Sequence, residues 1–122
     1  MPDDLRESES QRDSVTEAIS RGAVQILREY TGRGPTKART VIGGDTIAII
    51  LADTLTKGER SLVAMGEQQH VLHTRRNYQY VMRADLIGLV EKETGRGVNA
   101  MLSDNHVEPD IAVEFFLLDP EA

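Results

Sequence analysis

The chain has 122 residues, a formal net charge of -6, and neither cysteine nor tryptophan. Without cysteine it has no disulfides, thiolate zinc sites or cysteine nucleophiles, and a sequence pI near 5.0 argues against non-specific nucleic-acid binding. Its longest apolar run is far shorter than the roughly 20 residues of a membrane-spanning helix, and residues 1–4 lack the apolar stretch of a signal peptide. We expect a cytoplasmic protein with a disordered acidic segment at 1–9, one domain at 10–119 and a tail at 120–122.

In the first half, an apolar stripe at helical spacing predicts a helix from Ser8 or Ser10 to Thr31. Gly22 weakens this helix by about 1 kcal/mol relative to alanine, and we therefore expect close packing there. Two strands follow, 38–42 and 46–52, joined by a glycine-rich turn that supplies the positive φ of a tight hairpin. The second strand is apolar on both faces, which indicates a central strand covered on both sides.

In the second half, Thr56 and Glu59 have the spacing of a capping box, which predicts a short helix that buries Leu62, Val63 and Met65. A longer helix then ends at Gly95. Its expected apolar face consists of Val71, Tyr78, Val81, Met82, Leu86, Leu89 and Val90. The last two strands are predicted at 98–102 and 111–118, with a polar connection over 103–110.

These elements predict an α+β domain in the order α-ββ-α-α-ββ, with a four-stranded antiparallel sheet made from two hairpins. We expect Ile50 to share a sheet face with Phe116 and Leu118. Such an apolar face is not left in water, and a homodimer that buries it is the preferred explanation.

A short sequence repeats in the chain. Residues 31–34 (Thr-Gly-Arg-Gly) recur as residues 94–97, each time between a predicted helix and a predicted strand. Glycine after a helix adopts the left-handed conformation that other residues avoid. The repeat is therefore explained either by two convergent helix stops or by a duplicated helix–hairpin unit.

Two groups of residues are candidates for metal binding. Glu67, His70 and His73 are three residues apart and share one face of a helix, but exposed side chains explain them as well. The connection 103–110 is rich in oxygen ligands, yet it lacks the spacing of an EF-hand. Its polar residues are explained equally by turn formation or by contact with a partner. We predict no metal and no cofactor.

Charge is segregated along the chain. Residues 21–40 contain five cations and one acid, a net +4, whereas residues 97–122 contain six acids and no lysine or arginine. This division could steer an anion to the basic segment or dock that segment on the acidic part of another subunit. Arg33, between two glycines, could offer a guanidinium and backbone amides to a phosphate. No nucleotide-binding glycine motif is present.

The sequence has no nucleophile motif of the G-x-S-x-G type. Asp110 and Glu114 could form a pair of catalytic carboxylates, which leaves hydrolase or lyase chemistry over 104–114 as a minority interpretation. A role without catalysis is the preferred prediction.

The motif around Arg33, the segment from Leu55 to Glu59, the repeat at 94–97 and the ending 103–117 together resemble the MpsC-like family, over residues 14–118. The family, formerly a bacterial domain of unknown function, is named for a proposed sodium-translocating, membrane-potential-generating system and is associated with ion or inorganic-carbon uptake. The resemblance implies a small accessory protein, with no established catalytic residues. The candidate ligand- or partner-binding residues are Gly32, Arg33, Gly34, Arg39, Glu59, Arg76, Arg96, Asp104, His106, Asp110 and Glu114.

The preferred function is therefore that of a non-enzymatic, homodimeric accessory or regulatory domain. It would dock on a protein of a membrane transport system and reach the membrane through that partner. The alternative is a sensor that binds a nucleotide, phosphate or bicarbonate near the Gly-Arg-Gly turn at Arg33 and Arg39.

Overall fold

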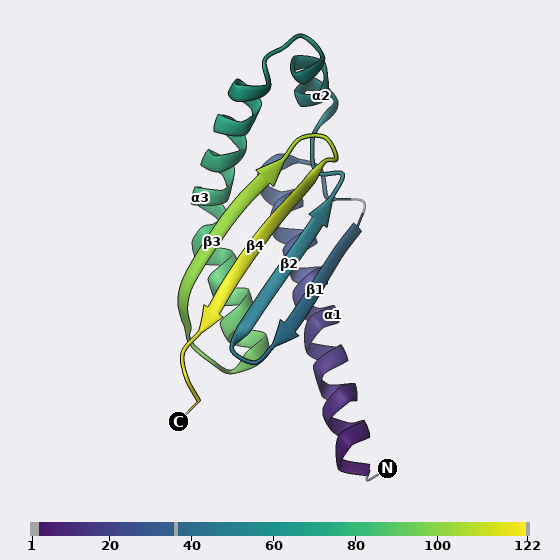
Figure 1. Ribbon diagram of the computed structural model, residues 1–122, viewed down its shortest axis with the longest axis vertical. Coiled ribbons are helices and arrows are strands. Elements are labelled where there is room, and N and C mark those ends of the chain that lie inside the picture. Colours follow the sequence, from purple (N-terminus) through teal and green to yellow (C-terminus); the bar gives the residue numbers. More distant parts are fainter. Residues whose placement is uncertain (1–2, 36, 122) are drawn as a thin grey trace.

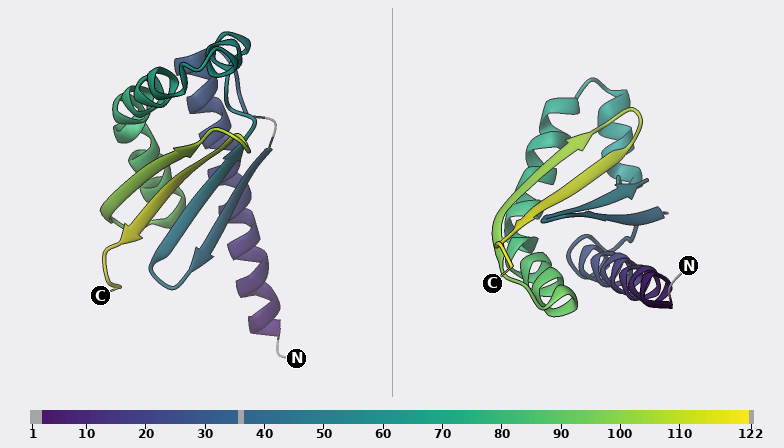
Figure 2. Two further views of the ribbon diagram at one scale, coloured as in Figure 1. Left: turned by 45° about the horizontal axis from the view of Figure 1, so that its top comes forward. Right: turned by 60° about the horizontal axis from the view of Figure 1, so that its bottom comes forward.

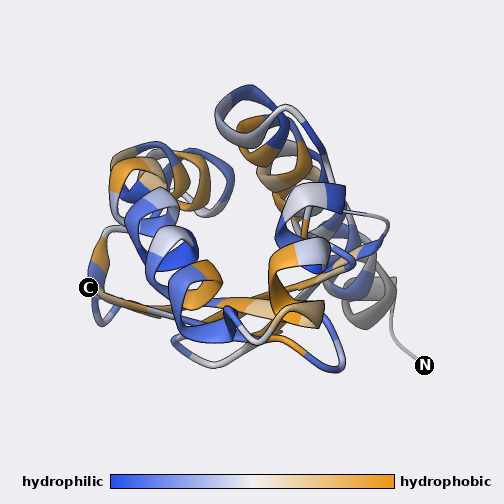
Figure 3. Cartoon of the chain, turned by 90° about the horizontal axis from the view of Figure 1, so that it is seen from above, coloured by the Kyte–Doolittle hydropathy of each residue, from blue (hydrophilic) through white to orange (hydrophobic). Residues whose placement is uncertain are grey.

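The computed structural model describes residues 3–35 and 37–121 and confirms the predicted α+β fold (Figure 1). Four antiparallel strands form one sheet in the order β1-β2-β4-β3. Figure 3 shows the helices on one side of this sheet, so its other face is open. The elements are α1 (Asp3–Thr31), β1 (Lys37–Gly43), β2 (Thr46–Ala52), α2 (Lys57–Ala64), α3 (Gln68–Thr94), β3 (Val98–His106) and β4 (Ile111–Leu118).

Helix α1 begins at Asp3, earlier than the predicted start at Ser8 or Ser10. The structure therefore places residues 3–9 in the helix rather than apart from it. These residues include leucine, arginine and glutamate, which favour helix even where no apolar stripe is present. The helix projects beyond the sheet at its N-terminal end (Figure 2). Met1 and Pro2 lie outside the described residues.

The hydrophobic core lies between the sheet and the two long helices. Helices α1 and α3 also contact each other, and the predicted close packing at Gly22 is confirmed. A Cβ atom at this position would lie 2.9 Å from Leu89 Cδ2 of α3, closer than van der Waals contact allows. The buried core residues are Ile19, Ala23, Leu27, Ile47, Ile49, Leu51, Met82, Leu86, Val90, Met101, Ala112, Phe116 and Leu118.

The strand register shows which side chains share a face. Ile47 pairs with Phe116 and Ile49 with Glu114, and these residues point toward the helices. Ile50 pairs with Val113 and is therefore on the open face. The prediction that Ile50 shares a face with Phe116 and Leu118 is wrong, because the antiparallel register places them on opposite sides of the sheet.

The predicted bounds of β2 and β4 are confirmed, but β3 is longer than predicted. It continues to His106, so residues 103–106 are in the sheet and only 107–110 connect the two strands. The prediction of a polar loop over 103–110 is wrong. Polar residues are tolerated here because β3 is an edge strand, where side chains at the border reach water.

The capping box at the start of α2 is confirmed, with Thr56 Oγ1 accepting from the Glu59 amide at 3.1 Å. Leu62 and Val63 are half-buried, but Met65 is 77% exposed, because it caps the helix rather than facing the core. Val81 is also exposed, contrary to the predicted apolar face of α3. Two residues of the buried stripe of this helix are polar, and Val81 is not part of it. The stripe consists of Val71, Arg75, Gln79, Met82, Leu86 and Val90.

The two Thr-Gly-Arg-Gly turns have the same local structure. Gly32 and Gly95 have φ of 76° and 69°, in the left-handed region that favours glycine. Each threonine hydroxyl donates to the carbonyl four residues before it, at 2.8 Å from Thr31 and 2.7 Å from Thr94. Each also accepts from the arginine amide two residues later, at 3.3 and 3.2 Å. Both turns thus stop a helix and direct the chain into an edge strand.

Candidate functional site

Four charged side chains meet at the end of the molecule where α2 lies (top of Figure 1). We call Arg33, Asp53, Arg60 and Asp110 the junction cluster. Arg33 Nη2 lies 2.9 Å from Asp53 Oδ2, and the Arg60 guanidinium contacts the other oxygen of Asp53. Arg60 Nη2 is 3.9 Å from Asp110 Oδ2. The cluster joins the turn after α1, the β2–α2 link and the β3–β4 turn.

Asp110 holds the link between β2 and α2 through neutral donors as well. Its carboxylate accepts from the Thr54 hydroxyl at 3.1 Å and from the Leu55 amide at 2.9 Å. Its carbonyl accepts from the Asp53 amide at 3.0 Å. Asp53 has a φ of 59°, unusual for a residue other than glycine, and these contacts hold it there.

A buried ion pair extends from this end of the molecule toward the core. Arg75 is 4% exposed, and its Nε lies 3.4 Å from Glu59 Oε2. The same guanidinium donates to the Thr54 carbonyl, while Glu59 Oε1 accepts from the Thr56 amide at 2.8 Å. Glu59 therefore serves both the cap of α2 and a cation of α3, which fixes one helix against the other.

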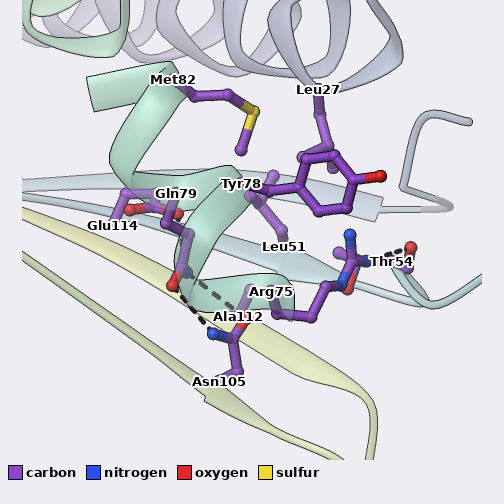
Figure 4. Close-up of a pocket in the computed structure, with 10 residues that line it drawn as sticks. All are labelled: Leu27, Leu51, Thr54, Arg75, Tyr78, Gln79, Met82, Asn105, Ala112 and Glu114. Atoms are coloured by element: carbon purple, nitrogen blue, oxygen red, sulfur yellow. Dashed lines mark hydrogen bonds between the residues drawn. The ribbon is translucent and has the colours of Figure 1, made fainter. Parts of the chain in front are cut away.

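Glu114 is the centre of a second polar network, in the middle of β4 and 1% exposed (Figure 4). Its Oε1 accepts from Gln79 Nε2 at 3.0 Å, and its other oxygen accepts from the Ser103 hydroxyl. Gln79 Oε1 in turn accepts from Asn105 Nδ2 at 2.8 Å. The network ties α3 to both strands of the second hairpin, without a cation bonded to the carboxylate.

Burial raises the pKa of the Glu114 carboxyl from 4.5 to about 7, because the charged form loses its hydration. The hydrogen bonds from Ser103 and Gln79 oppose this rise, since they stabilise the carboxylate. A cavity of about 10 Å³ lies beside Glu114, with Arg75, Gln79 and Asn105 among its lining. That volume has room for about one water and for no substrate.

Arg96, in the second repeat, lies at the opposite end of the sheet. Its guanidinium donates to Asp45 Oδ1 at 2.6 Å and to the Asp119 carbonyl at 2.7 Å. Nη1 is also 3.6 Å from Glu121 Oε1. Arg96 thereby joins the β1–β2 turn to the segment after β4, and it does not meet the other candidate residues.

Three candidates belong to the open face of the sheet. Arg39 is exposed on β1, and Asp104 and His106 are exposed on β3, the opposite edge strand. The metal site considered for the connection 103–110 depended on a loop, whereas Asp104 and His106 are strand residues. Among the described residues, no group of three or more histidines or carboxylates could hold a metal ion.

Arg76 is exposed on α3, apart from the other candidates, and lines a groove beside β3. At the first turn, Gly32 has open space around it, whereas a Cβ at Gly34 would lie 3.2 Å from Val24 Cγ1. The structure thus places Arg33 with its flanking glycines, Asp110 and Glu59 at one end of the molecule, where Arg33 and Asp110 belong to the junction cluster and Glu59 pairs with Arg75. The remaining candidates lie elsewhere.

Sequence reasoning missed the partners that complete these networks, which are Asp53, Arg60, Arg75 and Gln79. A signal was present for two of them, since Arg75 and Gln79 continue the helical spacing of Val71 and Met82. Polar residues on an apolar stripe indicate buried hydrogen bonds to another element.

The arrangement favours a structural role for these charges over catalysis. The carboxylates of Asp110 and Glu114 are engaged by separate sets of donors, so they do not form a pair that faces a common ligand. The deep cavity next to Glu114 is too small for a substrate. In the described part of the chain, no helix has the length and apolar character needed to cross a membrane.

The comparisons with known proteins place the chain in one family. The matching family model is described as "Na+-translocating membrane potential-generating system (MpsC)", and it matches residues 11–120. No curated protein and no solved structure matches the chain. Because the match covers nearly all of the domain, including both turns and every candidate residue named above, this chain belongs to the MpsC family.

Proposed function

We propose that this chain is a non-enzymatic accessory domain that works as a homodimer, with the open face of its sheet as the interface. The observation that carries the proposal is that all three helices lie on one side of an apolar sheet (Figure 3). We define the open face as the side chains of Val41, Ala48, Ile50, Leu102, Val113, Phe115 and Leu117.

The open face is apolar beyond what an exposed sheet requires. Leu102 is 68% exposed, Val41 46% and Leu117 38%. The register places Val41, Ala48, Phe115 and Leu102 in one continuous row across all four strands. Antiparallel sheets that face water normally alternate apolar and polar residues, so an apolar row across the whole sheet supports burial by a partner.

Charge at the two edges of this face favours a second copy as that partner. In the next row, Arg39 on β1 and Asp104 on β3 flank Ile50 and Val113. The row beyond it has Lys37 at the β1 edge and His106 at the β3 edge. One edge is therefore basic and the other acidic or neutral, with apolar residues between them.

This distribution selects one two-fold arrangement. A two-fold axis parallel to the strands places β1 of one protomer opposite β3 of its partner and keeps the rows aligned. Arg39 then faces Asp104 of the other copy twice, and Val41 faces Leu102. An axis perpendicular to the strands in the same plane would place β1 against β1 of the partner, so that the two basic edges with Lys37 and Arg39 face each other, which is repulsive. Self-complementarity of this kind is what a two-fold interface needs.

The size of the face predicts a dimer of moderate affinity. Four strands about 4.8 Å apart and about seven residues long give a projected area of roughly 400 Å² per protomer. Stable interfaces bury about 800 Å² per partner. We therefore expect a dissociation constant in the micromolar range, and a monomer–dimer equilibrium that depends on concentration.

Sedimentation equilibrium over a range of protein concentrations tests the proposal. The native chain should form a dimer whose fraction rises with protein concentration. The variant Leu102→Glu should be monomeric, because each protomer would then bring one negative charge into the apolar row. Met65→Glu is the control, since Met65 is also a largely exposed apolar residue but follows α2, away from the open face. A native chain that remains monomeric at several hundred micromolar would refute the proposal.

A charge exchange tests the arrangement of the dimer. Arg39→Glu or Asp104→Lys alone should weaken association, because each places like charges opposite one another. The double variant carrying both changes should restore it. If the native chain dimerises but the double variant is weaker than either single variant, the face is correct and the two-fold axis is wrong.

In this proposal the dimer is the form in which the accessory domain docks on the membrane-potential-generating system after which the family is named. The domain would remain in the cytoplasm and reach the membrane through that partner. The alternative function, anion binding at the first turn, has less support. The Arg33 guanidinium is paired with Asp53, and its amide donates to Thr31, so both groups are already engaged.

A further inference from the structure

We propose that the groove between α3 and β3 binds a tetrahedral oxyanion of the phosphate type. This α3–β3 groove is lined by Arg76, Gln79, Tyr80, Arg83 and Ser103, and its volume is about 170 Å³. It lies on the helix side of the sheet edge, so it is separate from the open face and from the junction cluster. The inference does not depend on dimer formation.

The groove is positively charged in a chain that is acidic overall. Arg76 and Arg83 are seven residues apart, two helical turns, and therefore lie on one side of α3. None of the residues that line the groove is a carboxylate. The nearest carboxylate bonded to the lining is that of Glu114, which is fully buried behind Gln79 and Ser103.

These two arginines, like Arg39 on β1, differ from four other arginines described above. Arg33, Arg60, Arg75 and Arg96 are all paired with carboxylates. Among the described residues, neither Arg76 nor Arg83 has an ion pair, and Arg83 is held by one hydrogen bond from Nη1 to the Met101 carbonyl at 3.1 Å. That bond orients the Arg83 guanidinium next to the groove and leaves its remaining donors available.

Tyr80 adds a third donor between the two arginines. Its side chain is 79% exposed, although it is a large aromatic residue with an apolar ring. The Ser103 hydroxyl donates to Glu114, so the donors left for a ligand are the two guanidinium groups and the Tyr80 phenol. Guanidinium groups bind carboxylates and phosphates bidentately.

The number of donors and the size of the groove select the ligand. A carboxylate has two oxygens and is satisfied by one guanidinium fork, whereas a phosphate presents oxygens in several directions at once. The volume is below the roughly 300 Å³ at which pockets for larger ligands begin. A phosphate group, free or with a short carbon chain, fits these limits, and a nucleotide does not.

The test is a titration followed by ¹H–¹⁵N NMR at constant ionic strength, with inorganic phosphate, glycerol phosphate and acetate as separate ligands. We expect saturable shifts centred on Arg76, Tyr80 and Arg83, with phosphate or glycerol phosphate tighter than acetate. If glycerol phosphate binds more tightly than inorganic phosphate, the natural ligand is a phosphate ester. If the two bind with equal affinity, the natural ligand is free phosphate. Arg76→Gln should weaken binding about tenfold or more.

Arg21→Gln is the matched control, because Arg21 is an exposed arginine of α1 whose loss changes the net charge equally. It should leave the affinity unchanged. The proposal is overturned if no saturable binding occurs at tens of millimolar phosphate, or if both variants weaken binding equally, which would indicate general charge attraction. Shifts centred on the first Gly-Arg-Gly turn would overturn it as well and would place the anion at Arg33.

Discussion

The buried carboxylate of Glu114 makes the stability of the fold depend on pH. The side chain is 1% exposed, and burial raises its pKa from 4.5 to about 7. Between these two values the folded protein holds a proton that the unfolded chain has released. The free energy of unfolding therefore falls as the pH rises through this range and is level above it.

The magnitude follows from the same two values. One unit of pKa difference corresponds to about 1.4 kcal/mol, so Glu114 contributes about 2–3 kcal/mol more stability at pH 5 than at pH 8. Glu114→Gln imitates the protonated form: its amide oxygen can accept from Gln79, and its amide group can donate to the Ser103 oxygen. The stability advantage of the variant over the native chain should therefore grow by about 2–3 kcal/mol between pH 5 and pH 8.

Urea unfolding at several pH values between 5 and 8 measures this difference. Protein concentration must be held constant, because a dimer makes stability depend on it. Glu108→Gln is the control, because it removes an exposed carboxylate and shows how the loss of one charge alone changes the dependence of the unfolding free energy on pH. Parallel profiles for the native chain and Glu114→Gln would refute the reasoning, because Glu114 would then titrate alike in the folded and unfolded states.

Three further predictions concern stability and are measured by urea or thermal unfolding. Gly22→Ala should destabilise the protein by about 1–3 kcal/mol, because the added Cβ collides with Leu89, and Leu89→Ala should relieve part of that cost in the double variant. Gly95→Ala should lower the free energy of unfolding by about 1–2 kcal/mol, because Gly95 has a positive φ. Gly88→Ala, in an open part of α3, should raise it by up to about 1 kcal/mol. Asp110→Ala should cost about 2 kcal/mol, because it leaves two donors of the β2–α2 link unpaired. Equal effects of Gly88→Ala in α3 and Gly95→Ala directly after it would contradict the conformational argument.

Local signals explain which elements could be predicted from the sequence. Strands β2 and β4 consist of apolar and β-branched residues between turn residues, and their bounds are confirmed. The capping box at Thr56 and Glu59 depends only on neighbouring residues, so it was predictable as well. The glycine turns ended both long helices where expected.

Strand β3 could not be predicted in full, because its last four residues are polar and have low strand propensity. Their extended conformation depends on pairing with β4, a long-range contact that no local pattern reveals. The same limit applies to the buried stripe of α3. Arg75 and Gln79 replace apolar residues there because Thr54, Glu59 and Glu114 offer them partners from distant parts of the chain.

The candidate residues were identified by type, but their grouping depended on the fold. Arg33, Glu59 and Asp110 are far apart in sequence and lie near one another because the turn after α1, the start of α2 and the β3–β4 turn are at one end of the sheet. Each of them pairs with a residue that the sequence did not single out. An apolar face that includes Ile50 was expected, but Phe116 and Leu118 were wrongly assigned to it. Alternation shows which residues of a strand share a face, whereas the register with the neighbouring strand requires the structure.

The repeated turn is better explained by a duplicated helix–hairpin unit than by two convergent helix stops. Convergence accounts for a glycine after each helix, but not for the same threonine bonds in both turns. In the first unit, Arg33 pairs with Asp53, directly after β2; in the second, Arg96 donates to the Asp119 carbonyl, directly after β4.

The sheet order agrees with this interpretation. In β1-β2-β4-β3, the first strand of each hairpin is at an edge and the second is central, as an internal two-fold axis between β2 and β4 would produce. Helix α2 and the polar networks at its end are then the additions that distinguish the second unit. A domain built from two such units has one face covered by its own two helices and one face without cover. This uncovered face is the open face that the proposed dimer buries.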